Sequence, residues 1–567
     1  MTTWTFAPLQ NQKEYSLHEK IVLEYFFTNI DKNIYCAKNT LSNQLWAFLV
    51  WQYSRSTLSL RDRFLQLFDD AQIALEKWII HEDEYISLEK LSQSITNSQS
   101  FHIDFFEKKA WEFLKKWWVD YWHNSLKDAD RIRFAIEWVS QVFTKVIESP
   151  FPNLWDFQEK STRYLHFWKE SLIFPPDIKN SLYADEIISM TWELIEIYET
   201  FTPQVKLALE KNKIINKEDC VSQRAYENTL NAKTFDIIRY LLPTNVCTSL
   251  WASFSTRTLE SHLSFMMSYP SEEVRFVAQS MYNEAIQLSP WLLSHVWPSS
   301  YEIQRKIKLE NYIDDLLWVN EQEDDEEIGL FQWIEDSDRV NIIFEWDLDN
   351  HICACILFES GRKEWLSYDE CMDIVNEMDN SDKDVLMKLS FWERWIHDRM
   401  PKALQHSTVM FEYLLDFWAY RDIQRHRASY QLWQWATAIH GYDYPEYIDL
   451  PGMEEFKSHY DQVMTKATLL SKKIIKQNSY ISEYACALWH LVRTTFEMNP
   501  GQIAYVFEMR TTPWGHESYR RLFQESFSQF KKLAPLFSRY IRVWTEKNLS
   551  RQKQENASEE KRKKLGI

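Results

Sequence analysis

The scarcity of glycine is the feature that most restricts how this chain can fold. Only 7 of the 567 residues are glycine, and none occurs before Gly329. At the usual frequency of roughly 7%, the first 328 residues would hold about 23. Glycine is the residue that most readily adopts positive φ, which tight turns and close ligand contacts require. Turns in the N-terminal half must therefore be built from other residues.

Tryptophan is in large excess, with 27 residues, and the 7 glycines and 27 tryptophans together come close to a normal glycine count. We hypothesise that many of these tryptophans are UGA codons that the source lineage decodes as glycine. The alternative is an unusually aromatic core. Peptide masses of the native protein would distinguish the two, because tryptophan is much heavier than glycine.

Length and composition indicate a soluble protein of several domains. A chain of 567 residues is too long for one ordinary core, and its apolar share of 45% is normal for a globular protein. It has no apolar run of about 18 residues that could cross a membrane, and Met1–Thr5 do not resemble a secretion signal. The seven scattered cysteines give neither a disulfide framework nor zinc spacing. We therefore expect a protein of the reducing cytoplasm, with no metal and no membrane partner.

The net charge of −19 argues against a protein that coats nucleic acid, which would need a basic face. It does not exclude an anionic small-molecule substrate, because a few convergent arginines set the local field.

Apolar spacing predicts a helix-rich chain. Apolar residues recur at helical spacing in segments 14–28, 41–53, 105–119 and 130–147, whereas 339–359 is typical of a β-hairpin. The acidic run Glu321–Glu327 is the best linker candidate. We predict an N-terminal copy of one fold over 1–300, an acidic linker region over 301–330, a C-terminal copy over 331–545 and a charged tail over 546–567.

Two short segments, 261 residues apart in the chain, look like the halves of one motif. They are Gln158-Glu159-Lys160-Ser161-Thr162-Arg163-Tyr164 and Arg425-His426-Arg427. Together they resemble the signature of the flavin-dependent thymidylate synthases, which is Arg-His-Arg, a short spacer, and Asn-Glu-x-Ser-x-Arg-Tyr. Here the second half of the signature comes first. The resemblance implies an α+β fold of helices with a small antiparallel sheet, present as two diverged copies.

In the N-terminal half the resemblance assigns mainly nucleotide contacts. Glu159, Ser161, Arg163 and Arg239 would bind dUMP, and arginine suits a phosphate because its fork donates two charge-assisted hydrogen bonds. The flavin contacts implied for this half are His123, Ser125 and Arg257. Where Arg-His-Arg should stand, the chain has Glu148-Ser149-Pro150-Phe151.

The C-terminal half keeps what the first half lacks. Arg425 would bind the nucleotide, and His406, His426 and Arg427 would face the flavin. Arg510 matches the arginine thought to help ionise N3 of uracil, and its N-terminal counterpart is Met266. Conversely, Glu483 and Gly501 replace the arginines that correspond to Arg239 and Arg257, and no Ser-x-Arg-Tyr follows Arg427. Asp422 replaces a glutamine that usually contacts the nucleotide.

These complementary losses predict a composite site shared by the two halves. The resemblance implies transfer of a methylene from methylenetetrahydrofolate to dUMP and its reduction with FAD, which NADPH regenerates. A flavin carries the redox chemistry, so no enzyme nucleophile is needed. In the family each site lies between subunits of a tetramer, and two fused chains would mimic that assembly as a homodimer.

Several tryptophans also stand where the family pattern has glycine. They are Trp122, Trp138, Trp251 and Trp418.

Two other hypotheses remain open. One is a non-catalytic relative that binds flavin or nucleotide, in which Asp422 and Trp435 mark decay. The other is an all-helical scaffold in which the matches are accidental.

Overall fold

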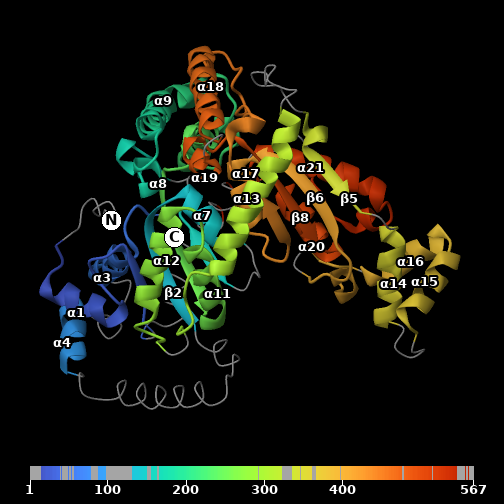
Figure 1. Ribbon diagram of the computed structural model, residues 1–567, viewed down its shortest axis with the longest axis horizontal. Helices are drawn as coiled ribbons and strands as arrows, with labels where there is room; N and C mark the ends of the chain where they lie inside the picture. The colour runs from blue at the N-terminus through green and yellow to red at the C-terminus, as the bar shows by residue number, and fades with distance from the viewer. Residues whose placement is uncertain are drawn as a thin grey trace. The chain divides into compact units, whose positions relative to one another are not determined.

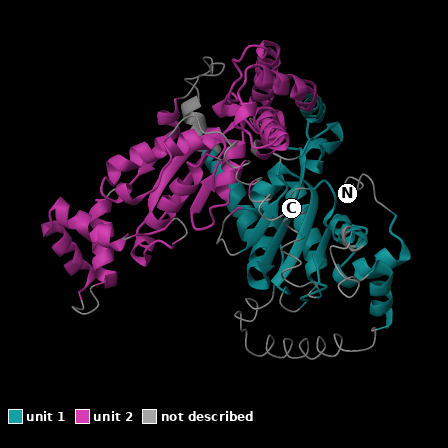
Figure 2. Cartoon of the chain, turned by 180° about the vertical axis from the view of Figure 1, so that it is seen from behind, with its two compact units in different colours: residues 1–148, 154–192, 244–328 teal, residues 149–153, 193–243, 329–567 magenta. Residues whose placement is uncertain are grey.

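The computed structural model describes most of the chain. The residues described are 14–38, 40, 49, 53, 56–77, 87–97, 131–149, 155–161, 165–290, 293–321, 335–344, 347–360, 366–391, 393–395, 398–475, 478–513, 515–545, 556 and 560. They form two compact units (Figure 2). Unit 1 is 1–148, 154–192 and 244–328, and unit 2 is 149–153, 193–243 and 329–567. The segment 193–243 therefore belongs to unit 2, although it comes from the N-terminal half.

Unit 1 is built on a four-stranded antiparallel sheet of order β1-β2-β4-β3. Its strands are β1 (Ile34–Ala37), β2 (Arg131–Ser140), β3 (Asp156–Glu159) and β4 (Cys247–Ser255). Its helices are α1 (Leu17–Phe26), α3 (Leu60–Glu76), α4 (Leu88–Asn97), α7 (Gln141–Ile147), α8 (Pro176–Lys179), α11 (Thr256–Met267), α12 (Glu272–Ala285) and α13 (Ser300–Glu321). The 28-residue helix α9 (Ala184–Lys211) begins in unit 1 and continues in unit 2.

Unit 2 has a second four-stranded antiparallel sheet, of order β5-β6-β8-β7 (Figure 1). Its strands are β5 (Val340–Ile343), β6 (Val409–Asp416), β7 (Tyr430–Trp433) and β8 (Leu491–Met498). Its helices are α10 (Gln223–Ile238), α14 (Leu348–Ser360), α15 (Tyr368–Glu377), α16 (Asn380–Ser390), α17 (Phe417–Gln424), α18 (Glu454–Ile475), α19 (Ser479–Ser482), α20 (Pro500–Arg510) and α21 (Glu517–Leu533).

The two sheets have the same plan, which confirms the predicted α+β fold in two copies. In each, a helix follows the second strand of the sheet order directly and another follows the third. These helices start at side-chain caps: Ser140 and Asp416 cap α7 and α17, and Ser255 and Asn499 cap α11 and α20. Such a side chain accepts a hydrogen bond from a backbone N–H that has no partner within the helix.

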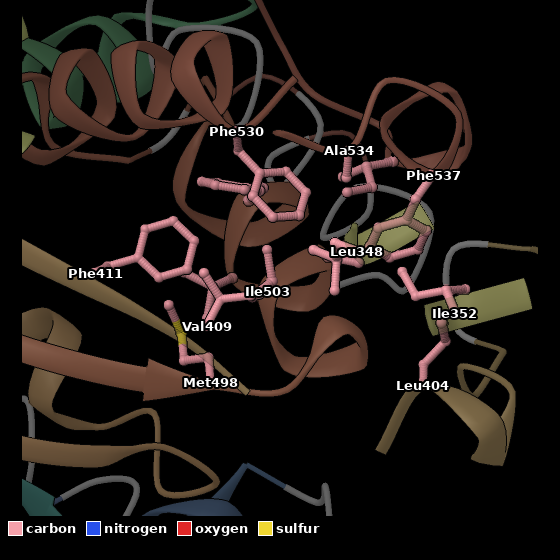
Figure 3. Close-up of a cluster of buried hydrophobic side chains, with 14 of the residues drawn as sticks. Leu348, Ile352, Leu404, Val409, Phe411, Met498, Ile503, Phe530, Ala534 and Phe537 are labelled. Atoms are coloured by element: carbon pink, nitrogen blue, oxygen red, sulfur yellow. The ribbon is translucent and has the colours of Figure 1, made fainter. Parts of the chain in front are cut away.

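An apolar cluster holds unit 2 together on one side of its sheet (Figure 3). Val409 and Phe411 of β6 and Met498 of β8 contribute to it, as do Ile503 of α20 and Phe530 of α21. Each is at most 2% exposed. Burial of this kind contributes roughly 25 cal/mol per Å² of apolar surface, so the cluster fixes where β6, β8 and α20 lie.

The hairpin predicted over 339–359 is wrong. Residues 340–343 form β5, but 348–360 form helix α14. The run Ile352–Ile356 is buried throughout, so it shows no periodicity that separates helix from strand.

The helix predicted over 130–147 is wrong in its first part, because 131–140 is strand β2. Central in its sheet, β2 is buried on both faces along most of its length, which hides its alternation.

The helix predicted over 14–28 is confirmed as α1. The segment 105–119 and almost all of 41–53 lie outside the described residues, as do most of the acidic run and the tail. Residues 300–321, next to that run, form α13.

Trp138 occupies a β-bulge in β2, where the pairing with β4 shifts between Glu137 and Val139. Its φ is +61°, a left-handed conformation that costs an L-residue roughly 1–2 kcal/mol. Glycine adopts it without that penalty, and bulges of this kind commonly carry glycine. The structure therefore favours glycine at position 138, in agreement with the recoding hypothesis.

Trp138→Gly should raise the free energy of unfolding by about 1 kcal/mol, because the left-handed strain disappears. Denaturant titration measures the change. Trp251→Gly is the matched control, because Trp251 has ordinary strand pairing in β4 and packs against a buried cluster. The control should destabilise the protein through lost packing. A destabilised Trp138→Gly variant would contradict a glycine requirement at the bulge.

Candidate functional site

Helix α17 positions the Arg-His-Arg segment at one end of the sheet in unit 2. It follows β6 directly, and the backbone N–H groups of Phe417 and Trp418 donate to the carbonyls of His490 and Leu488. The helix ends at Gln424, and Arg425 is its C-cap. The Arg-His-Arg segment is therefore attached directly to a helix, which restricts where its three side chains can lie.

Arg510, the last residue of α20, binds to this end of α17. Its Nε donates to His426 Nε2 at 2.7 Å, and its Nη2 donates to the carbonyl of Asp422. The guanidinium carbon also lies 5.4 Å from the ring centre of Tyr519, within range for a cation–π contact. The structure thus brings the predicted residues His426 and Arg510 into direct contact.

His426 is buried, with 4% of its surface exposed. Burial lowers the pKa of its imidazole well below 6.5, and the positive charge of Arg510 lowers it further. The ring is therefore neutral at physiological pH and can accept the hydrogen bond from Arg510.

Arg425 and Arg427 are only partly buried. The side chain of Arg425 is 34% exposed, and its Nη1 lies 3.8 Å from Asp422 Oδ1. Asp422, where the family has glutamine, therefore serves here as a weak ion-pair partner. Both arginines border the buried His426 with part of their surface open to solvent.

Arg239 lies in unit 2 as well, although it belongs to the N-terminal copy. Its side chain is fully buried, with Nη2 3.2 Å from Asp236 Oδ1 and the guanidinium 4.9 Å from the ring centre of Trp418. Nε and Nη1 have no hydrogen-bond partner among the described residues. Trp418 stands near the start of α17 and Arg425 at its end. Arg239 and the Arg-His-Arg segment thus lie toward opposite ends of one helix.

The surroundings of Arg239 are buried and acidic. Burial raises the pKa of Asp416, the N-cap of α17, to about 7. Tyr240, the residue after Arg239, forms a hydrogen bond to His516, with its hydroxyl oxygen 2.6 Å from Nδ1 of the imidazole. The ring centre of Tyr240 lies 3.3 Å from that of Trp489, closer than the usual 4.5–7 Å of aromatic pairs.

Three predicted residues of the N-terminal copy lie in unit 1. Glu159 ends β3 and is 2% exposed, Ser161 follows it and is half-buried, and Arg257 is exposed in the first turn of α11. His123, Ser125 and Arg163 lie outside the described residues, as does Trp122. The roles given to these residues stay predictions.

His406 lines a cavity of 1440 Å³ in unit 2. Its walls include the aromatic and apolar side chains of Phe344, Phe358, Leu366, Tyr368 and Met372, and the polar groups of His351, Lys402, Ser407, Thr408 and Glu497. Ligand pockets of about 300–1,000 Å³ hold drug-sized molecules, so this cavity can take a larger one. Nε2 of His351 is buried without a partner among the described residues, and Ser407 has a φ of +70°. Both features are typical of a ligand site.

The two copies can be matched residue by residue through the caps of α11 and α20. Counted from Ser255 and Asn499, Arg257 corresponds to Gly501 and Met266 to Arg510. Counted backwards, Arg239 corresponds to Glu483, and each begins a short 3₁₀ helix. The complementary replacements noted in the sequence therefore fall at equivalent positions of the fold.

Sequence reasoning missed some contacts. Tyr519 had no assigned role, and Gln502 and Tyr505 of α20, which approach His426, were not considered. These contacts depend on where α20 and α21 lie beside the end of α17, which residue spacing does not give. Among the residues described, no cluster of His, Cys, Asp or Glu could hold a metal ion, and no helix has the length and apolarity to span a membrane.

Fold and site together define a two-copy α+β protein that gathers arginines from both copies in unit 2. The family model described as thymidylate synthase complementing protein matches residues 74–291 of this chain. The match supports a thymidylate-synthase-like enzyme.

Relatives match almost the whole chain, as expected of a fused two-copy protein. A UPF0159 protein of Chlamydia muridarum is 26% identical and one of Chlamydia pneumoniae is 24% identical, each over 97% of this chain and 99% of the relative. A solved UMP/dUMP methylase from Streptomyces cacaoi, bound with 5-Br dUMP, is also similar, with a TM-score of 0.26 and 12% identity over 35% of this chain and 93% of that one.

Proposed function

We propose that the chain is a flavin-dependent thymidylate synthase, which converts dUMP to dTMP with methylenetetrahydrofolate and NADPH. One observation carries the proposal. Arg239 of the first copy and Arg425, His426 and Arg510 of the second lie along or against helix α17. Each copy lacks at the equivalent positions what the other keeps. Glu159, Ser161 and Arg163 would complete the nucleotide site. Two chains would form a homodimer that mimics the tetramer of the family.

The residues of unit 2 suit an anionic, planar substrate. Arg425, which is 34% exposed, offers a guanidinium group for a phosphate, which binds arginine through two parallel hydrogen bonds. Arg510 is anchored at Nε and Nη2, so its charge is preorganised toward the negative charge that develops at N3–O4 of uracil.

FAD is the cofactor that the proposal requires. The aromatic walls of the cavity suit its ring, whereas the carboxylates of Asp347, Glu359, Asp369 and Glu497 in the same lining do not suit its diphosphate. Lys402, His406 and Ser407 offer polar contacts. The bound flavin would supply the redox chemistry: the methylene is transferred from methylenetetrahydrofolate to dUMP, and two electrons from NADPH would reduce it to the methyl group of dTMP, with tetrahydrofolate released. Arg257 and Arg427 stay candidates for further flavin contacts, with His123 and Ser125.

Complementation of a thymidine-requiring strain tests this function. The full chain should restore growth, and the Arg510→Ala variant should not. Arg539→Ala is the matched control, because it removes a guanidinium that is 58% exposed in a surface pair with Asp384. The purified protein should also be yellow. A colourless protein that restores no growth would contradict the proposal.

A non-catalytic relative that binds flavin or nucleotide is the alternative. The burial of Arg239 beneath Trp418 favours this alternative for a chain that has tryptophan at position 418, because the buried guanidinium cannot reach a phosphate. A yellow protein that binds dUMP but fails to complement would identify this case.

A further inference from the structure

The contacts of Arg510 use one edge of its guanidinium. Nε donates to His426 Nε2, and Nη2 donates to the carbonyl of Asp422, both at the end of α17. Nη1 makes no hydrogen bond to the residues that the structure describes. An arginine held along one edge is fixed in plane and presents its remaining donors in one direction.

The geometry also defines the tautomer of His426. Because Arg510 Nε carries a hydrogen, His426 Nε2 must be the unprotonated acceptor, and the ring proton sits on Nδ1. Nδ1 lies 3.5 Å from the side-chain amide of Gln502, whose oxygen can turn toward it. A protonated ring would have a hydrogen on both nitrogens and would repel Arg510.

The backbone and neighbours of His426 keep the ring in place. Its N–H donates to Ile423 at 2.9 Å, and its carbonyl accepts from the N–H of Ser429 and from Gln431 Nε2, each at 3.2 Å. Tyr505 of α20 packs edge-on, 5.8 Å from the imidazole. The charged group that contacts the ring is Arg510 on α20; the charged residues of its own segment are Asp422 with its partner Arg425, and Arg427.

We propose that His426 is a positioning residue: its unprotonated Nε2 anchors Arg510, so that the free Nη1 edge faces an anionic group of the substrate. This proposal rests on the proposed function, in which that group is the N3–O4 edge of uracil. It reassigns His426, which the family resemblance placed against the flavin, to the arginine that stabilises the developing charge.

Three substitutions test the role through kinetics. His426→Leu removes the acceptor and should lower kcat about 10²-fold, as loss of one preorganised donor does, with little change in KM for dUMP. His426→Gln keeps an acceptor oxygen near the position of Nε2 and should retain kcat within about tenfold. Adding His426→Leu to Arg510→Ala should cost nothing more, because His426 acts only through Arg510. A wild-type kcat for His426→Leu, or multiplicative losses in the double variant, would overturn the proposal.

The pH profile separates positioning from a structural role. The imidazole must stay neutral, so the wild-type kcat should fall only at a pH well below 6.5, where His426 takes up a proton. The His426→Gln variant should lack this fall in kcat at acid pH, and its melting temperature should equal that of the wild type. An unchanged fall in the Gln variant would mean that another group titrates.

Nitrogen-15 NMR of the histidine rings gives a readout that needs no activity. The resonances that are absent from the spectrum of the His426→Gln variant are those of His426. In the wild type this ring should be the Nδ1–H tautomer and neutral at pH 6. Arg510→Ala should raise its pKa toward 6.5. An Nε2–H tautomer would refute the positioning role even in an active enzyme. The expected tautomer in a protein without synthase activity would refute only the proposed function.

Discussion

Arg510→Ala should lower kcat for dTMP formation by about 10²–10³-fold, which corresponds to roughly 2.7–4 kcal/mol of lost transition-state stabilisation. The charge of Arg510 is fixed before the reaction by His426 and Asp422, so no reorganisation is needed as negative charge develops on the uracil ring. Single-turnover measurement of dTMP formation isolates this step from product release.

Arg539→Ala removes the same functional group from the exposed pair with Asp384 and should leave kcat unchanged. Arg510→Lys should recover little, because an ammonium cannot satisfy His426 and Asp422 and still present a donor edge. KM for dUMP should rise far less than kcat falls. A wild-type turnover number for Arg510→Ala would remove Arg510 from the chemistry.

The fold could be predicted from the sequence as far as the family resemblance extends. The resemblance implied two copies, and the matching sheet orders confirm them. Local patterns failed where burial is complete: α14 was taken for the second arm of a hairpin and β2 for a helix. In both segments side chains on more than one face are buried, so the sequence of apolar residues shows neither the alternation of a strand nor the spacing of an amphipathic helix.

The candidate site could be predicted only in part, because its contacts depend on packing rather than on motif spacing. Register identified Arg510 as the counterpart of Met266, but not its bond to His426, which requires α20 to end beside the last turn of α17. Similarly, the sequence placed Arg239 in the N-terminal copy, and only the fold assigns 193–243 to unit 2. The relation of Glu159 and Ser161 to Arg425 stays a prediction.

Trp418→Gly should strengthen dUMP binding about tenfold or more. The indole covers Arg239, whose Nε and Nη1 are buried without partners among the described residues, and the indole Nε1 of Trp418 also lacks one. Removing the indole would expose these donors to a phosphate. A hydrogen bond to a charged group contributes about 1.5–3 kcal/mol, and 1.4 kcal/mol is a tenfold change in affinity. Calorimetric titration with dUMP measures the gain.

Two controls separate this effect from general loosening. Trp297→Gly removes an indole that is 55% exposed and should leave dUMP affinity unchanged. Arg239→Ala in the Trp418→Gly background should abolish the gain, because the donors are then absent. If Trp418→Gly binds dUMP no more tightly than the written chain, Arg239 is not a phosphate ligand beneath position 418.

The same position tests the origin of the tryptophan excess. At Trp138 the backbone conformation favours glycine, and at Trp418 an indole seals donors that the proposed function needs. Trp251 shows neither property and packs as an ordinary strand residue, so the tryptophans are not equivalent. If UGA is read as glycine, the native peptide that contains position 418 will have the mass for glycine, and native protein will bind dUMP as the Trp418→Gly variant does. A tryptophan mass at 418, together with synthase activity in the native protein, would show that Arg239 acts elsewhere.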